Sequence, residues 1–268
     1  ACVKVLKSEP GEPVNPDLVM NELEKEIYDV LALVYTETST GLTYRVARKI
    51  ALKAKDLGAL VIVDAVSALG GEYLGVSDFG FDAVASCSQK ALAAPPGLSF
   101  VALSTEGVNK VFKTYKKPPY LDLALYLRFH EKLETPTTPA VNLLYALNVA
   151  LQIILREGLE KWVRIHEERA KLLYTALPSV NLDPLVKEPD FRSNTVTVFK
   201  VPNGIKASNI VRYVAKKGYI ISPGMGNLKE KIIRIGTMGN INIDNLKGLI
   251  DAINDFINKQ AKARNSSL

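Results

Sequence analysis

The 268-residue sequence has few of the residues from which metal centres and disulfide frameworks are built. It contains two cysteines, Cys2 and Cys87, and two histidines, His130 and His166. Two cysteines are too few for a disulfide framework, and these residues together do not form a plausible zinc set. We therefore expect no metal site of the His/Cys type, and we expect Cys87 to be a small buried residue.

Long apolar runs are absent as well. No run approaches the ~20 residues that span a bilayer, and the first residues, ACVKVLKSEPGEP, lack the apolar centre of a signal peptide. We therefore expect a cytoplasmic protein with no membrane partner. The formal net charge is +6, but the basic residues are dispersed, with clusters only at 113–117 and 259–268. Such clusters are typical of solvated surface, so nucleic acid is not an expected partner, while small anionic molecules fit the charge equally well.

What the sequence does contain is the pattern of a parallel α/β sheet. Residues 29–35 and 59–64 are short, almost wholly apolar runs, which predict strands buried on both faces. Between them, apolar residues recur at helical spacing over 44–57, and Gly58 ends that helix. This strand, helix, strand order predicts a right-handed crossover between two parallel strands.

The remaining elements fall into two groups. Strands at 81–86 and 98–104 continue the first sheet, and helices follow at 139–155 and 159–177, the first with Thr138 as N-cap and Pro139 at its first position. A separate α+β region then begins, with predicted strands at 195–201, 219–222 and 232–236, a helix at 207–218 and a capped terminal helix at 241–258. We expect two domains, residues 1–157 and 158–268.

Polar side chains follow three of the apolar runs, at the point where each strand ends. They are Thr38, Ser39 and Thr40 after the first, Asp64 after the second, and Ser86, Ser88, Gln89 and Lys90 after the third. Ligands of open α/β sheets bind beyond the carboxyl ends of the strands, so these side chains are expected to converge. No serine-hydrolase triad or Gly-rich nucleotide loop is present, whereas an amine, a carboxylate and hydroxyls are what pyridoxal phosphate requires.

Six segments carry a resemblance to a known family. VDAVSALGG at 63–71 and SCSQKALAAPPG at 86–97 resemble the signature of class V, fold-type I pyridoxal-phosphate aminotransferases, especially the alanine–glyoxylate and serine–pyruvate group. TETSTG at 36–41, YLDL at 120–123, TPTTP at 135–139 and IIRIGTMG at 232–239 follow in the family's order. The resemblance implies the family's large domain, incomplete at its N-terminus, with a mainly parallel sheet, plus a C-terminal α+β small domain.

The resemblance also implies a role for individual residues. It makes Lys90 the Schiff-base lysine and proton shuttle, Asp64 the partner of the pyridine nitrogen, and Arg234 the residue that grips the substrate carboxylate. The residues that it places at the cofactor are Val66, Gln89, Thr38 and, from across a homodimer interface, Thr138. Thr135 stands where the family usually has a tyrosine.

Each role has a plainer alternative. Asp64 and Thr38 could be turn residues, Thr138 only a helix cap, and Arg234 the partner of a surface acid.

The resemblance implies transfer of an amino group from a small amino acid, such as alanine or serine, to a 2-oxo acid, glyoxylate or pyruvate.

Other functions stay open from the sequence. One is a class V lyase such as a cysteine desulfurase, which has histidine where Gln89 stands; another is a catalytically incomplete fragment or structural partner. Family members begin with roughly a hundred further residues that hold a phosphate loop at a helix N-terminus. We therefore expect an additional N-terminal segment in the working enzyme.

Overall fold

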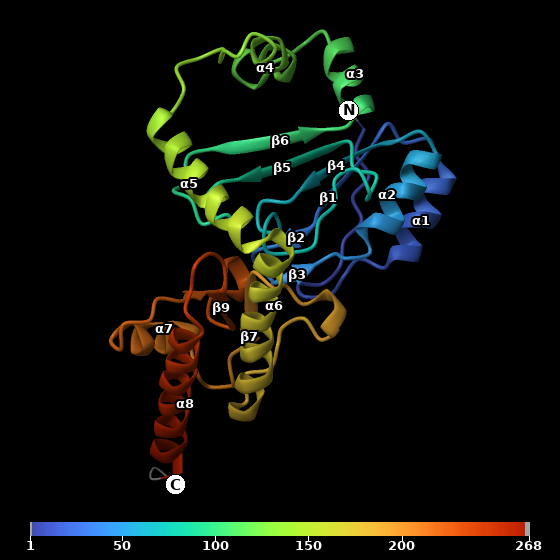
Figure 1. Ribbon diagram of the computed structural model, residues 1–268. Helices are drawn as coiled ribbons and strands as arrows, with labels where there is room; N and C mark the ends of the chain where they lie inside the picture. Colours follow the sequence, from blue (N-terminus) through green and yellow to red (C-terminus); the bar gives the residue numbers. More distant parts are fainter. Residues whose placement is uncertain (1, 266–268) are drawn as a thin grey trace.

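The computed structural model describes residues 2–265 of the chain, which form a four-stranded sheet, a three-stranded sheet and a two-stranded hairpin (Figure 1). The first sheet has the order β1-β4-β5-β6, built from β1 (Val30–Val34), β4 (Leu60–Asp64), β5 (Ala83–Cys87) and β6 (Ser99–Leu103). β1, β4 and β5 are parallel, whereas β6 is antiparallel to β5. Helix α2 (Ala47–Asp56) connects β1 to β4, which confirms the predicted crossover.

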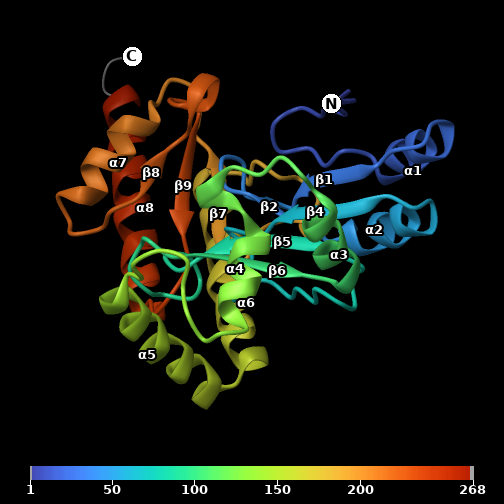
Figure 2. The ribbon, with the colours of Figure 1, turned by 90° about the horizontal axis from the view of Figure 1, so that it is seen from above.

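One face of this sheet is packed and forms the N-terminal core. Val61, Val63 and Val84 are buried there against Ile50 and Ala54 of α2, because every second residue of a strand points to the same face. Helix α1 (Pro16–Lys25) packs beside α2, on the same side of the sheet in both views (Figures 1 and 2).

The opposite face of the sheet is exposed and apolar. Val30, Val34, Ile62 and Val101 all lie on it, with exposed fractions between 41% and 46%. The prediction that β1 and β4 are buried on both faces is therefore wrong for the described residues. A continuous apolar run indicates that both faces of a strand can be buried, but it does not determine which other elements pack on each face.

Two hairpin strands and a series of helices surround the first sheet. They are β2 (Thr36–Glu37), β3 (Leu42–Thr43), α3 (Thr105–Lys113), the short 3₁₀ segment Pro119–Leu121, α4 (Leu123–His130), α5 (Val141–Glu157) and α6 (Leu159–Ala176). Gly58, at φ +86°, follows α2, and Gly158, at φ +87°, separates α5 from α6. Glycine adopts this left-handed conformation without strain, which explains both helix ends.

The predicted start of the helix after Thr138 is wrong. Helix α5 begins at Val141, its N-cap is Ala140, and the Val141 amide instead donates to the carbonyl of Pro139 at 2.9 Å. With φ −78° and ψ 71°, Ala140 makes an inverse γ-turn, which separates Pro139 from the helix. Thr138 lies exposed in the preceding loop.

The second sheet is antiparallel and small, with the order β7-β9-β8. Its strands are β7 (Val196–Lys200), β9 (Ile232–Gly236) and β8 (Ser222–Pro223), so the strand predicted at 219–222 is shorter and later than expected. Helices α7 (Ala207–Ala215) and α8 (Ile243–Asn265) bury Ile210 and Ile253 against β7 and β9. Asn242 caps α8 by accepting from the Asp244 amide.

Helix α6 lies beside the second sheet (Figure 1) and packs against α5, α8 and β7. Three short 3₁₀ segments complete the described chain, at Leu177–Val180, Pro189–Phe191 and Gly226–Leu228. Residues 266–268, which belong to the basic cluster predicted from the sequence, lie outside the described residues. The division into domains at residue 157 stays a prediction.

Candidate active site

Lys90 lies in a tightly bonded loop just after β5. The Ser88 hydroxyl donates to the Pro95 carbonyl at 2.6 Å, and the Ala93 amide donates to the carbonyl of Lys90 itself at 2.9 Å. Ala93 has φ +59°, a left-handed conformation that is costly for a residue with a Cβ. Lys90 is half-buried, so the loop holds its backbone while the residue stays partly exposed.

Helix α6 is hydrogen-bonded to this loop. The indole nitrogen of Trp162 donates to the Ala91 carbonyl at 3.0 Å. His166, one turn further along, is fully buried; its Nδ1 lies 2.8 Å from the Trp162 carbonyl, and its Nε2 accepts from the Gly239 amide at 3.1 Å. Burial lowers the pKa of His166, in keeping with a neutral ring that donates from Nδ1. These residues were not predicted, although Trp162 is the only tryptophan of the sequence.

Asp64 lies at the carboxyl end of β4, next to the strand that leads to Lys90. Its carboxylate accepts from the Val66 amide at 2.8 Å, so it does cap the turn that follows. Asp64 pairs with Ala85 of β5, and its side chain lies on the exposed face of the sheet. Val66 is half-buried in the turn.

Thr38 and Arg234 meet, although they are almost two hundred residues apart in the sequence. The Thr38 hydroxyl is 2.6 Å from the Ser67 hydroxyl, and the Thr38 carbonyl accepts from the Arg234 guanidinium at 3.4 Å. Arg234 also donates through Nε to the Pro223 carbonyl at 3.0 Å. The structure therefore brings the C-terminal sheet to the turn that follows Asp64.

Other predicted residues are not drawn into these contacts. The Gln89 side chain is exposed, and Thr138 is exposed in the loop between α4 and α5. Thr135, also exposed, donates its hydroxyl to the Thr137 carbonyl at 2.8 Å. Cys87 is buried in β5, as predicted.

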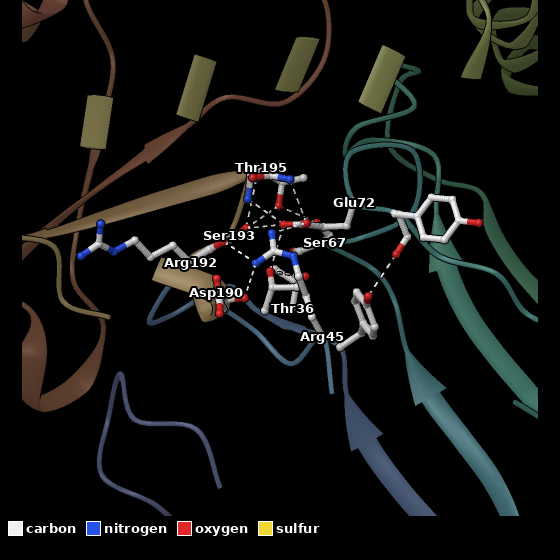
Figure 3. A network of polar contacts seen from close by, with 12 residues as sticks. Thr36, Arg45, Ser67, Glu72, Asp190, Arg192, Ser193 and Thr195 are labelled. Carbon is white, nitrogen blue, oxygen red and sulfur yellow. Dashed lines mark hydrogen bonds and ion pairs between the residues drawn. The ribbon is translucent and has the colours of Figure 1, made fainter. Parts of the chain in front are cut away.

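A buried carboxylate that was not predicted lies directly after the turn. Glu72 is 2% exposed, and its two oxygens accept hydrogen bonds from both halves of the chain (Figure 3). One oxygen accepts from Thr43 and from the Asn194 amide, at 2.9 and 2.6 Å, and the other from Arg45 at 2.7 Å. Burial raises the pKa of Glu72, against the opposing effect of Arg45.

The donor set fits pyridoxal phosphate. The cofactor requires a lysine amine for covalent attachment and a carboxylate for its ring nitrogen, and Lys90 and Asp64 place an amine and a carboxylate at the ends of neighbouring strands. Asp64 reaches the exposed face, where a ring has room, and its turn is already fixed by its own hydrogen bond.

Comparison with known proteins identifies the family. The model of the family described as Aminotransferase class-V matches residues 1–242. The chain belongs to the class V aminotransferase family. This confirms the resemblance, and the family normally uses pyridoxal phosphate.

Two curated relatives illustrate the similarity. An uncharacterised aminotransferase of Methanocaldococcus jannaschii is 41% identical over 240 residues, which cover 87% of this chain and 61% of the relative. The serine–glyoxylate aminotransferase of Arabidopsis thaliana is 32% identical over 259 residues, covering 94% and 64%. The chain thus spans less than two thirds of the length of these curated relatives.

A solved structure confirms the fold. The alanine–glyoxylate aminotransferase of Nostoc sp. superposes with a TM-score of 0.85 at 30% identity, covering 91% of this chain and 66% of that one. The predicted α/β architecture, with a mainly parallel sheet and a smaller C-terminal α+β part, is therefore confirmed. Among the described residues, no helix is both long and apolar enough to cross a membrane.

Proposed function

We propose that the protein containing this chain transfers an amino group from a small amino acid, such as alanine or serine, to a 2-oxo acid, glyoxylate or pyruvate, with pyridoxal phosphate as cofactor. The observation that carries the proposal is the placement of Lys90 and Asp64 at the ends of neighbouring strands in a class V chain. The similarity to serine–glyoxylate and alanine–glyoxylate aminotransferases supports this substrate class.

In this proposal the residues of the chain divide the work. Pyridoxal phosphate, when bound, accepts the electron pair that is left when the substrate loses its α-proton. Lys90 Nζ would take that α-proton and deliver it to the cofactor's C4′, the net proton shift that transamination requires, and the Asp64 carboxylate would keep a proton on the ring nitrogen. Arg234 holds the substrate carboxylate through its planar fork of donors, and Val66 packs on the ring. Gln89 and the Thr38–Ser67 pair supply polar contacts around the cofactor.

A homodimer is part of the proposal. Helix α5 exposes Val141, Leu144, Tyr145 and Leu155, at 49%, 45%, 70% and 75%, which is a large apolar surface for one helix. If a second copy covers it, the exposed Thr138 just before α5 is at that interface, where the proposal has it contact the partner's cofactor phosphate. A cysteine desulfurase is less well supported, because Gln89 precedes Lys90 and Cys87 is buried.

The direct test is Lys90→Ala in the full-length protein. We expect loss of transamination together with loss of the yellow absorbance of the lysine-bound cofactor, because both depend on the same amine. Lys110→Ala, on the exposed side of α3, is the matched control and should change neither. Turnover of the Lys90→Ala protein near the parent rate would reject the assignment.

A further inference from the structure

Glu72 and Arg45 connect segments that are far apart in the sequence (Figure 3). The Arg45 guanidinium donates hydrogen bonds through one nitrogen to Glu72, at 2.7 Å. Through the other nitrogen it donates to the carbonyls of Asp190 and Arg192, at 2.7 and 2.9 Å. Glu72 in turn accepts from the amide and the side chain of Asn194, at 2.6 and 3.1 Å. One ion pair therefore joins the β3–α2 connection, the turn after β4 and the chain entering β7.

This buried network contributes more to fixing the relative positions of the segments that it joins than to the stability of the fold. Removing a carboxylate from water is costly, and a well-packed apolar group of similar volume is often as stabilising as a buried ion pair. Here, however, both Glu72 oxygens are saturated by donors from several segments, so each donor has a fixed place. Such a network specifies one arrangement of the two sheets.

The same network leads to Arg234 by two routes. On the first, the Asn194 carbonyl accepts from the Thr237 hydroxyl at 2.5 Å, and Thr237 directly follows β9, the strand that carries Arg234. On the second, the Thr195 hydroxyl donates to the Ser67 carbonyl at 2.6 Å. Ser67 also bonds Thr38, whose carbonyl accepts from Arg234.

We propose that Glu72 and Arg45 are positioning residues that set where the Arg234 guanidinium stands relative to Asp64 and Lys90, and thereby set the affinity for the substrate carboxylate. The proposal rests on the role of Arg234 in the proposed function. Neither Glu72 nor Arg45 needs to touch the substrate, because they act through the backbone of residues 193–195 and the end of β9.

The test is Glu72→Gln in the full-length enzyme loaded with cofactor. Glutamine has the same shape, but its NH₂ group must face a donor, the Asn194 backbone amide in place of one oxygen or Arg45 in place of the other, so one side of the network opens. We expect the KM for the amino acid to rise about tenfold with kcat changed less than about threefold, below the ~100-fold loss that a 1 Å misplacement can cause. Arg45→Lys keeps the charge but loses the fork, and should raise KM about threefold.

Asp82→Asn is the matched control. Asp82 is also buried and ion-paired, to Lys55 at 2.9 Å, and accepts from the Val61 amide, but it lies at the opposite end of β5 from Lys90. Asp82→Asn should lower the melting temperature at least as much as Glu72→Gln, because folding lowers the pKa of Asp82 and so favours its charge, whereas it raises the pKa of Glu72. Only Glu72→Gln should raise KM.

Hydrogen exchange supplies a readout that is independent of catalysis. In Glu72→Gln the amides of residues 193–195 and 237–239 should exchange faster, since Asn194 bonds Glu72 directly and Thr237 bonds Thr195 and Asn194. In Asp82→Asn the faster amides should be those near Val61 and Ser104.

Three outcomes would overturn the proposal. The first is an unchanged KM in Glu72→Gln when Arg234→Lys does raise KM. If the glutamine variant does not fold, an unchanged KM in Arg45→Lys has the same meaning. The second is an equal rise of KM in Asp82→Asn, which would make the effect a general loss of stability. The third is an unchanged KM in Arg234→Lys, which places the failure in the proposed function, because the proposal depends on that role.

Discussion

At the scale of single residues, Asp64 has a local task in its turn and, in the proposed function, a chemical task at the cofactor. Its carboxylate accepts the Val66 amide, and its side chain nevertheless stays exposed at the carboxyl end of β4. Asparagine retains a carbonyl oxygen that can accept the same hydrogen bond. Asp64→Asn therefore removes the charge while it keeps the hydrogen bond of the turn.

We predict that Asp64→Asn retains the fold and the cofactor but lowers kcat by roughly 100-fold or more, because a neutral amide no longer keeps the ring nitrogen protonated. Turnover and the cofactor absorbance of the purified protein would be measured together, with the melting temperature as the check on folding. Normal transamination by this variant would show that Asp64 only caps its turn.

Some of these residues could be predicted from the sequence and others could not. Lys90 and Asp64 were predicted because each stands where an apolar run stops, which is a local signal. Glu72 and His166 give no such signal, because Glu72 bonds the Asn194 amide 122 residues away and His166 bonds the Gly239 amide 73 residues away. The contacts of Arg234 with Thr38 likewise exist only in the folded chain.

At the scale of elements, α6 supports the site without contributing a reacting group. Trp162 holds the Ala91 carbonyl, His166 holds the Gly239 amide, and Arg169 donates to the Gly239 carbonyl at 2.5 Å. The loop after Lys90 and the loop after β9 are thus fastened to one rigid helix. A protonated His166 could not accept from Gly239, so this fastening depends on pH.

We predict that His166 makes the protein less stable in mild acid. Its folded pKa lies below the ordinary 6.5, so the folded state binds fewer protons than the unfolded state, and the stabilisation present above about pH 6.5 is lost as the pH falls through the lowered value. The loss of stability between about pH 7.5 and 5.5, measured by urea unfolding, should be smaller in His166→Gln than in the parent.

His130→Gln is the control for this measurement, because His130 is the other histidine of the sequence and is exposed. The raised pKa of Glu72 acts with the opposite sign, adding stability as the pH falls, but it is common to all three proteins and cancels in the comparison. Identical pH dependence in the parent and His166→Gln would contradict the prediction.

The elements themselves were mostly predictable. Long apolar or periodic segments identified β1, β4, β9, α2 and α6 to within a few residues. The start of α5 was not identified, because an inverse γ-turn at Ala140 leaves no mark in residue type. The exposed sheet face was also missed, since a strand's sequence states its hydrophobicity and not what lies over it.

At the scale of the whole molecule, we predict that α5 mediates self-association. Leu144→Glu combined with Leu155→Glu should weaken association more than about tenfold, because a carboxylate is costly to bury without a partner. Sedimentation velocity over a range of concentrations would measure it. Ile220→Glu, at a residue 95% exposed far from α5 in the sequence, is the control; an equal effect there, or no effect of the α5 changes, would refute the prediction.

The Glu72 network also has a consequence for the order in which the protein can form. Asn194 follows Glu72 by 122 residues. Because ribosomes add about 5–20 residues per second, Asn194 is synthesised roughly 6–24 s after Glu72. During that interval the carboxylate and Arg45 lack their C-terminal partners and are best left in water. The first sheet can therefore assemble early, but the turn that carries Asp64 towards Lys90 acquires its final shape only when the chain beyond Asp190 arrives.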